Sequence, residues 1–494
     1  MKWKHVYVAV YLLLNSIILT GCGNINSGQA LEQETPAPVI RIGVGSYGKT
    51  KKDMDIVNQE LSSLSEEKIG VRMMLVPVGK NTSMLLNDIE NPVDIVCLSN
   101  EDYIAQRKSL CPIDGLLYQY GVNIIDLMGE DMIVLGKYEN ILYGIPKPMP
   151  DVHCTGVALS TKYLKKYRID TSQIHSMADF EPVLEMIKEN EPDLISFVPE
   201  RPGRGAIGRE VIGDVLAENL AMVYYDDPSM TVVNMYGTPE YEARVRMVRD
   251  WYLKGYLGDD ILTNMELGLN QVYAELAFST EFVVRPDEQQ AAQVTYGDKI
   301  TYVSFSERPY LSTSSNTVYF WTITKQCGDE IAAMKAMDLL YTDEDIISTI
   351  LYGAEGIHYV DKEDGHITYP EGVGSDTVGY VNSQKWRYNR NKGKIWDGVS
   401  LDLYDIMKEF NASAIKSPAY GFQFDGKKLS LDPSKLSQTI NDYSLKLGCG
   451  VVDVETALPE FRQKLKERGA DLLVEEVQEQ VDAWKSKRQI RISE

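Results

Sequence analysis

From Val39 onward, apolar runs of strand length alternate with helical patterns, and this alternation limits the folds open to the chain. Residues 39–44 are strand-like, and apolar residues then recur at spacings of three and four over 51–68, which predicts an amphipathic helix. Further strands are predicted at 71–78 and 93–98. Such alternation favours a parallel or mixed sheet covered by helices. The 494 residues are enough for two or three lobes, and the pattern favours two α/β lobes.

The later part of the chain continues in the same way. We predict helices at 177–189, 209–222, 240–254 and 330–341, a strand at 318–324, and a mostly helical tail over 459–488. In that tail Leu473, Val477, Val481 and Trp484 share one helix face. We therefore expect Trp484 to pack in the core and not to contact a ligand.

Two extended, proline-containing stretches, 143–148 and 308–314, separate the α/β segments and have the character of hinge crossings. They predict a discontinuous first lobe over 39–145 and 311–353. The second lobe would then take 146–310 and 354–494.

The N-terminus carries a leader. Lys2 and Lys4 precede an apolar run over 6–19, which is shorter than the roughly 20 residues of a spanning helix. The run ends in Leu19-Thr-Gly-Cys22, which resembles the bacterial lipobox. That resemblance implies a signal peptide over 1–21, acylation of Cys22 and a flexible tether over 22–38. The alternative is an ordinary signal peptide with an incidental cysteine.

Charge and cysteine content exclude several classes of function. The formal net charge of −22 disfavours nucleic-acid binding, and no basic patch is present to hold anionic lipid. With Cys22 acylated, five of the six cysteines remain, an odd number that is not a disulfide framework. Neither CxxC nor HExxH spacing occurs, so we expect no metal site.

A Gly43-Val-Gly-Ser-Tyr-Gly48 stretch satisfies the GxGxxG pattern of dinucleotide sites. The next predicted strand, however, ends at Val78-Gly-Lys80 without the acidic residue that holds a ribose. We therefore expect no cofactor, and the stretch is either a tight turn or a ligand-binding turn. No GxSxG nucleophile motif occurs and no carboxylate pair stands out, so no catalytic residues are assigned.

Aromatic residues are the positive signal for a ligand. The chain has 30 tyrosines beside 6 tryptophans and 10 phenylalanines. Sugar rings present apolar C–H faces and polar edges, so carbohydrate sites combine flat aromatic side chains with hydrogen-bonding groups. Most individual tyrosines and tryptophans still belong to the core or its rim.

Several phrases, in order, resemble bacterial extracellular solute-binding lipoproteins of carbohydrate ABC importers, in the LipO or LplA-like subset with a C-terminal domain of unknown function. They are Tyr143-Gly-Ile-Pro146 and the segments 156–167, 248–257, 332–341, 351–359, 417–425 and 475–484. Two stretches depart from the family pattern: 319–328, which contains Trp321, and Trp386-Arg-Tyr-Asn-Arg390.

The resemblance implies an α/β, two-lobed fold like that of periplasmic binding proteins, with hinge crossovers and a helical C-terminal segment. It also implies a non-enzymatic receptor, anchored to the cell membrane through its lipid and facing outside the cytoplasm. The receptor would close on a mono- or oligosaccharide and present it to ABC permease subunits. An exported glycan-active enzyme and a structural or signalling lipoprotein are the alternatives.

Position in the fold selects the candidate ligand contacts. Open α/β sheets bind ligands at the carboxyl ends of their strands. The first predicted strand ends at Ser46 and Tyr47, and the third ends at Ser99 and Asn100, so these residues should line the groove between the lobes. Residues just past the first crossing and three chosen for their chemistry complete the set: Asp151, His153, Glu281, Trp321 and Trp386. The two tryptophans are the expected stacking platforms and Glu281 a polar partner.

Overall fold

The computed structural model describes residues 36–45, 52–79, 81–150, 152–206, 213–426, 429 and 431–493. Residues 38–494 form one compact unit. The predicted leader, Cys22 and most of the predicted tether lie outside the described residues. Among the residues that are described, no helix is both long and apolar enough to cross a membrane.

A five-stranded sheet contains the N-terminal strands. Its order is β2-β1-β3-β15-β6, with β1 Val39–Gly45, β2 Arg72–Val78, β3 Ile95–Ser99, β6 Gly144–Pro146 and β15 Tyr319–Ile323. Strand β1 is parallel to β2 and β3, whereas β15 runs antiparallel to β3 and β6. The four strands predicted at 39–44, 71–78, 93–98 and 318–324 are confirmed.

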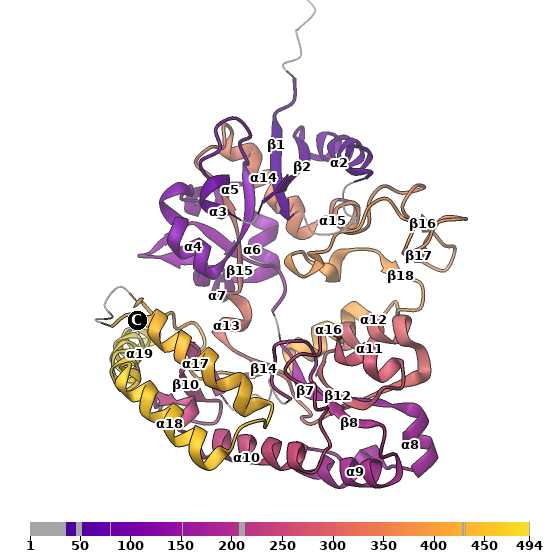
Figure 1. The fold of residues 1–494 in the computed structure, drawn as a ribbon. Coiled ribbons are helices and arrows are strands. Elements are labelled where there is room, and N and C mark those ends of the chain that lie inside the picture. The colour runs from indigo at the N-terminus through magenta and orange to yellow at the C-terminus, as the bar shows by residue number, and fades with distance from the viewer. Residues whose placement is uncertain are drawn as a thin grey trace, which may run out of the picture. The chain divides into compact units, whose positions relative to one another are not determined.

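Three helices with strongly apolar faces cover this sheet: α2 Met54–Ile69, α14 Glu330–Thr342 and α15 Glu344–Tyr352. Helix α2 lies beside β1 and β2 (Figure 1) and buries Met54, Val57 and Leu61. The same core takes in Tyr380 and Tyr388, beyond the expected first-lobe limit at residue 353. The exact lobe boundaries stay a prediction.

A second, four-stranded sheet has the order β13-β7-β12-β8, with β7 Cys154–Ser160, β8 Ile195–Val198, β12 Ala277–Val284 and β13 Ile300–Ser304. Strand β12 is parallel to β8 and antiparallel to β7. Helices α8 Thr161–Tyr167, α9 Met177–Asn190, α10 Pro239–Leu253, α11 Gly268–Tyr273 and α12 Pro286–Tyr296 belong to this part of the chain. The predictions for α9 and α10 are confirmed.

The helix predicted over 209–222 is wrong. The described part of that stretch contains β9 Gly213–Ala217 and the start of β10 Ala221–Tyr224, which pair antiparallel, with β11 Val233–Asn234 at the edge. Glu218 and Asn219, both with φ of 51°, form the turn between the two strands. The residues from Leu220 to Val223 are all buried, a continuous run that suits a strand enclosed on both faces.

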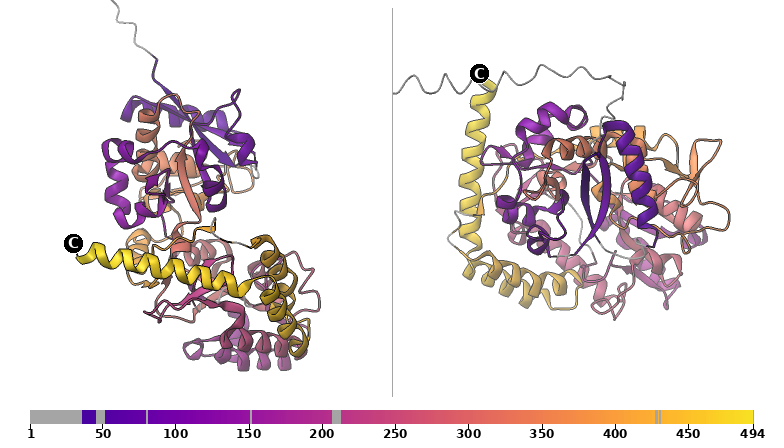
Figure 2. Two further views of the ribbon diagram at one scale, coloured as in Figure 1. Left: turned by 90° about the vertical axis from the view of Figure 1, so that its left-hand side faces the viewer. Right: turned by 90° about the horizontal axis from the view of Figure 1, so that it is seen from above.

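The helical tail predicted over 459–488 is confirmed by α18 Val454–Glu467 and α19 Ala470–Ser493, and α17 Pro433–Gly448, which lies outside that prediction, precedes them. Figure 2 shows α19 as the long helix that ends the chain. Leu473, Val477 and Val481 are fully buried, and the Trp484 ring centroid lies 6.1 Å from that of Phe422. The packing role predicted for Trp484 is confirmed.

Three chain segments lie side by side between the elements of the two large sheets. Strand β14 Tyr310–Leu311 pairs in parallel with β19 Ile415–Lys416, and Tyr310 also forms a β-bridge with His153. His153 follows the first predicted crossing, β14 lies within the second, and β19 precedes the C-terminal helices. The fold is α/β with two large sheets joined by crossovers and a helical C-terminal segment.

Candidate functional site

The carboxyl ends of β1 and β3 lie at the same edge of the first sheet because both strands run parallel. Ser99 begins α4 Asn100–Gln106 as its N-cap: its hydroxyl accepts a hydrogen bond from Asp102 N at 3.2 Å. The Ser99 hydroxyl is therefore engaged in capping. Asn100 is exposed, and its backbone N–H donates to Val318 O at 3.0 Å, so its side chain faces solvent at this edge.

Residues 384–390, here called the edge loop, cover that carboxyl edge. Gln384 Oε1 accepts a hydrogen bond from Gly45 N at 3.2 Å, at the end of β1. A Cβ on Gly45 would come within 2.4 Å of the Gln384 amide, so a larger residue there would displace the end of the Gln384 side chain. Arg387 Nη1 donates to Cys97 O in β3 at 3.2 Å. The edge loop thus contacts two of the parallel strands near their ends.

Trp321 is not available to a ligand. Its side chain is only 1% exposed within the core of the first sheet, and Nε1 donates to Arg387 O at 2.9 Å. Its ring lies 5.3 Å from that of Tyr388. The predicted stacking role is therefore contradicted: this tryptophan supports the edge loop from below, where its ring faces are covered by protein.

Trp386, in contrast, is 44% exposed and sits in the edge loop, within the short 3₁₀ turn η6 Lys385–Arg387. A ring held by a buttressed loop at the carboxyl edge of a sheet suits contact with a sugar face. The neighbouring Lys385 ammonium lies 5.1 Å from the Tyr352 ring centroid. Burial, together with the nearby Arg390 charge, lowers the pKa of Lys385.

On the second sheet, Glu281 lies in the middle of β12, opposite Val157 of β7, and is fully buried. It cannot reach a solute, so the predicted contact is contradicted. His153 is half-buried and its carbonyl accepts from Tyr310 N at 3.3 Å, next to the crossing segments. Ser46, Tyr47 and Asp151 lie outside the described residues, and their predicted contacts stay predictions.

An ion-pair cluster at the carboxyl end of β12 was not predicted from the sequence. Asp287 pairs with Arg285, with Oδ1 3.0 Å from Nε and Oδ2 2.9 Å from Nη2. Arg390 of the edge loop lies 2.9 Å from Asp287 Oδ2 and 3.5 Å from Glu288 Oε1. The cluster joins the edge loop to the start of α12. If β12 had been predicted as a strand, the rule that ligands bind at the carboxyl ends of strands would have selected Asp287, as it selected Asn100.

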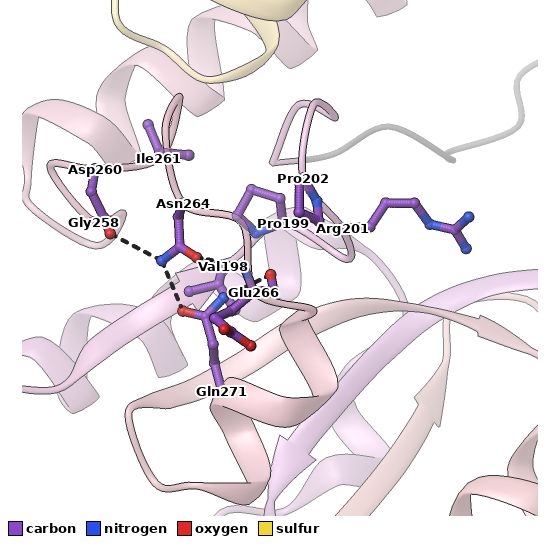
Figure 3. A pocket seen from close by; sticks show the side chains of 10 residues that line it. All are labelled: Val198, Pro199, Arg201, Pro202, Gly258, Asp260, Ile261, Asn264, Glu266 and Gln271. Atoms are coloured by element: carbon purple, nitrogen blue, oxygen red, sulfur yellow. Dashed lines mark hydrogen bonds between the residues drawn. The ribbon is translucent and has the colours of Figure 1, made fainter. Parts of the chain in front are cut away.

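Two recesses on the second sheet are poor candidates for the site. One (Figure 3) offers about 10 Å³, enough for about one water molecule, between the end of β8 and the loop before α11. Asn264 and Gln271 bond to each other there at 3.4 Å. The other, of about 220 Å³ around Lys162 and Tyr273, adjoins Ser160 at the end of β7. Because β7 is antiparallel to β12, that end is opposite to the one holding Asp287.

One group among the described residues has the spacing of metal ligands: Asp364, His366 and Asp397, whose ligand atoms lie within 4.8 Å of one another. The Lys362 ammonium already bridges the two carboxylates, at 3.1 Å from Asp364 Oδ2 and 3.0 Å from Asp397 Oδ1. The hydrogen bond to the Val399 carbonyl, and after it the one to Asp364, raises the pKa of His366. We therefore interpret these three side chains as a surface cluster whose negative charge is balanced by Lys362, and not as a metal site.

The sequence is similar to a known domain and to a known protein. Residues 418–486 match a domain of unknown function, DUF3502. A protein of Streptococcus pneumoniae serotype 4, named carbohydrate ABC transporter substrate-binding protein, is 23% identical over 98% of this chain and 99% of its own length.

Solved structures agree with that likeness. The N-glycan transport solute-binding protein NgtS of Streptococcus pneumoniae superposes with a TM-score of 0.78 at 22% identity, covering 91% of this chain and all of its own. Its complex with Man5GlcNAc has a TM-score of 0.67 at 22% identity, covering 91% and 99%. The chain therefore shares its fold with these solute-binding proteins, as the sequence motifs implied, and residues 418–486 match the DUF3502 model.

Proposed function

We propose that this protein is an extracellular solute-binding receptor that delivers an oligosaccharide to an ABC importer by closure of its two lobes. The observation that carries the proposal is the likeness to a carbohydrate ABC transporter substrate-binding protein over 98% of the chain. The likeness spans both large sheets, their crossovers and the C-terminal domain. Ligands that favour the closed lobes drive closure by their differential affinity for that state.

The solute is a glycan related to those bound by NgtS, which forms complexes with Man1GlcNAc and Man5GlcNAc. Trp386 stacks on a sugar ring from the edge loop, and Asn100 supplies hydrogen bonds from the end of β3. Ser46 and Tyr47 after β1, together with Asp151 and His153 past the first crossing, complete the contacts. The proposal leaves out Trp321 and Glu281, because both side chains are buried, and Ser99, because its hydroxyl caps α4.

The receptor works at the outer face of the cell membrane, held there by acylated Cys22, and it catalyses no reaction. The lipobox-like Leu19-Thr-Gly-Cys22 supports the anchor. The names of the relatives, which are substrate-binding proteins and not enzymes, support a receptor that turns over no substrate. Permease subunits are its protein partners.

Isothermal titration calorimetry on the chain lacking residues 1–22 tests the proposal. We expect saturable binding of Man5GlcNAc or a related mannosyl-N-acetylglucosamine glycan, and no binding of an unrelated glycan such as maltotriose. Trp386→Ala should weaken binding, whereas Tyr118→Ala, which removes an exposed ring from α5 Asp114–Tyr120, should not. Absence of binding across a panel of mono- and oligosaccharides would reject the proposed solute class.

The two alternatives give different results in the same samples. An exported glycan-active enzyme would convert a fluorescently labelled oligosaccharide to shorter products, which chromatography of the incubated sample detects. A structural or signalling lipoprotein would give neither products nor a glycan-induced rise in melting temperature.

A further inference from the structure

The C-terminal domain begins where the chain leaves the crossings between the two large sheets. Strand β19 pairs with β14, and the pairing continues as Ser417 N donates to Leu311 O at 2.8 Å. The matched domain starts at the next residue, 418. Residues 417–423, here called the connecting segment, therefore lie between the crossings and the C-terminal helices, the first of which begins at Pro433.

The connecting segment is bonded to the crossing that leads back to the first sheet. Gly421 N donates to Thr313 Oγ1 at 2.8 Å. Asn316, which is fully buried, donates from Nδ2 to the Tyr420 hydroxyl at 3.0 Å. Both partners belong to α13 Thr313–Asn316, the short helix before β15. Buried hydrogen bonds of this kind are costly to leave unmade, so they fix the segment against the crossing.

The same segment also contacts elements that pack on the first sheet. The Tyr420 hydroxyl lies 2.8 Å from Met132 Sδ in α7 Glu130–Ile133. Gln423 Nε2 donates to Leu135 O in the following 3₁₀ turn, and that turn packs on β6. The Tyr420 hydroxyl thus contacts both Asn316 in the crossing and Met132 in a helix that packs beside the first sheet.

At its other end the connecting segment is held by the C-terminal helices. Ala419 and Phe422 are buried in the same apolar cluster as Val477 of α19. Just beyond, Asp425 N donates to Gln480 Oε1 at 2.9 Å, and Gln480 Nε2 donates back to Asp425 O at 3.1 Å. The segment is therefore a stiff connection from a helical core to the crossings, and not a loose loop.

We propose that the C-terminal domain, matched only as a domain of unknown function, sets the spacing of the two lobes by bracing the hinge through residues 417–423. A change in that spacing must break or rearrange the contacts of Tyr420 and Gln423 with the first-sheet side. The helices α17 to α19 keep those two side chains in place. The proposal rests on the proposed function, because it assumes that lobe motion accompanies binding.

Spin-label distance measurements on the chain lacking residues 1–22 test this bracing. Labels go on Ser63→Cys in α2 and Glu189→Cys in α9, both exposed helix positions. The half-exposed Cys327 is first replaced by alanine, whereas the other four described cysteines are buried. We compare Tyr420→Phe, Gln423→Ala and the double variant with this parent, all without solute.

We expect each variant to broaden the interlobe distance distribution, with the population away from the parent's spacing rising about fivefold for each hydrogen bond lost. Tyr443→Phe is the matched control. Its hydroxyl bonds Glu460 at 2.7 Å within the same domain, so its loss should leave the distribution unchanged. If the double variant does not fold, the single variant Gln423→Ala decides the test.

A folded Gln423→Ala or double variant with the parent's distribution would overturn the proposal. Equal broadening by Tyr443→Phe would also overturn it, since it would mean that any loosened contact in the domain has the same effect. The measurement needs no solute, so a failure to bind glycans leaves its result intact. Rejection of the receptor function and rejection of the bracing role are therefore distinguishable.

Discussion

Arg390 and Asp287 form an ion pair, 2.9 Å between Nη2 and Oδ2, that joins the edge loop on the first sheet to the start of α12 after the second. Asp287 is 8% exposed and also holds the Arg285 guanidinium, itself 5% exposed. A carboxylate shared by two guanidiniums in a largely buried place is costly to remove, because positive charge would be left desolvated.

This relationship predicts unequal effects of two substitutions. Asp287→Asn should lower the free energy of unfolding by about 3 kcal/mol, since it removes the negative charge between two arginines. Arg390→Gln should cost less, about 1 kcal/mol, because the Arg390 side chain is 27% exposed and Arg285 still pairs with Asp287. Urea denaturation measures both. Equal losses, or none for Asp287→Asn, would contradict the shared-carboxylate interpretation.

Asp214 predicts a pH dependence of stability. It is 1% exposed in β9, and burial raises its pKa to about 6, offset in part by the Ser417 hydroxyl and the Thr313 N–H. A raised folded-state pKa means that ionisation costs more in the folded protein than in the unfolded chain. The contribution of Asp214 is therefore most favourable below about pH 4, declines as pH rises to about 6, and is constant above.

Asp214→Asn should remove that decline. At pH 7 the variant should be more stable than wild type by up to about 3 kcal/mol, the equivalent of a shift of about two pKa units. Near pH 4 the two proteins should differ by less than about 1 kcal/mol. Urea titrations at half-unit pH steps measure this, with the exposed Asp226→Asn as control. A constant difference between the variants at every pH would refute the assignment.

Substitution of the two candidate tryptophans should show a structural role for Trp321 and a ligand-binding role for Trp386. Trp321→Ala leaves a cavity in the core and should lower the free energy of unfolding by about 3–5 kcal/mol. Trp386→Ala should leave stability within about 0.5 kcal/mol but weaken glycan binding by about 1–3 kcal/mol. Urea denaturation and calorimetry on both variants provide the comparison. Unchanged glycan affinity in a folded Trp386→Ala would remove this residue from the proposed site.

The lipobox-like segment predicts the fate of a Cys22→Ala variant. Without the thiol no acyl group can be attached, so the protein should accumulate as uncleaved precursor or be shed from the membrane. Fractionation with mass spectrometry of the N-terminus measures both outcomes. A variant that stays membrane-bound and is processed before residue 22 would show that the anchor lies elsewhere.

The local sequence was sufficient to predict those helices and strands whose apolar residues recur at a regular spacing. The strand at 39–44, the helices α2, α10 and α14, and the core face of α19 with Trp484 follow directly from apolar spacing. The order of weakly specific phrases also identified the fold and the C-terminal domain. Periodicity fails at 209–222: it predicts a helix, but the described part holds β9 and the start of β10, a strand buried on both faces.

The candidate site depended on contacts between residues far apart in the chain. The sequence alone indicated which residues end the parallel strands, and hence Ser99 and Asn100, because strand direction follows from the β-α-β order. It could not distinguish Trp321 from Trp386, since burial is set by neighbours such as Tyr388 and not by local sequence. Only the tertiary structure brought Arg390 to Asp287 and Tyr420 to Asn316, because such pairings form when distant segments pack together.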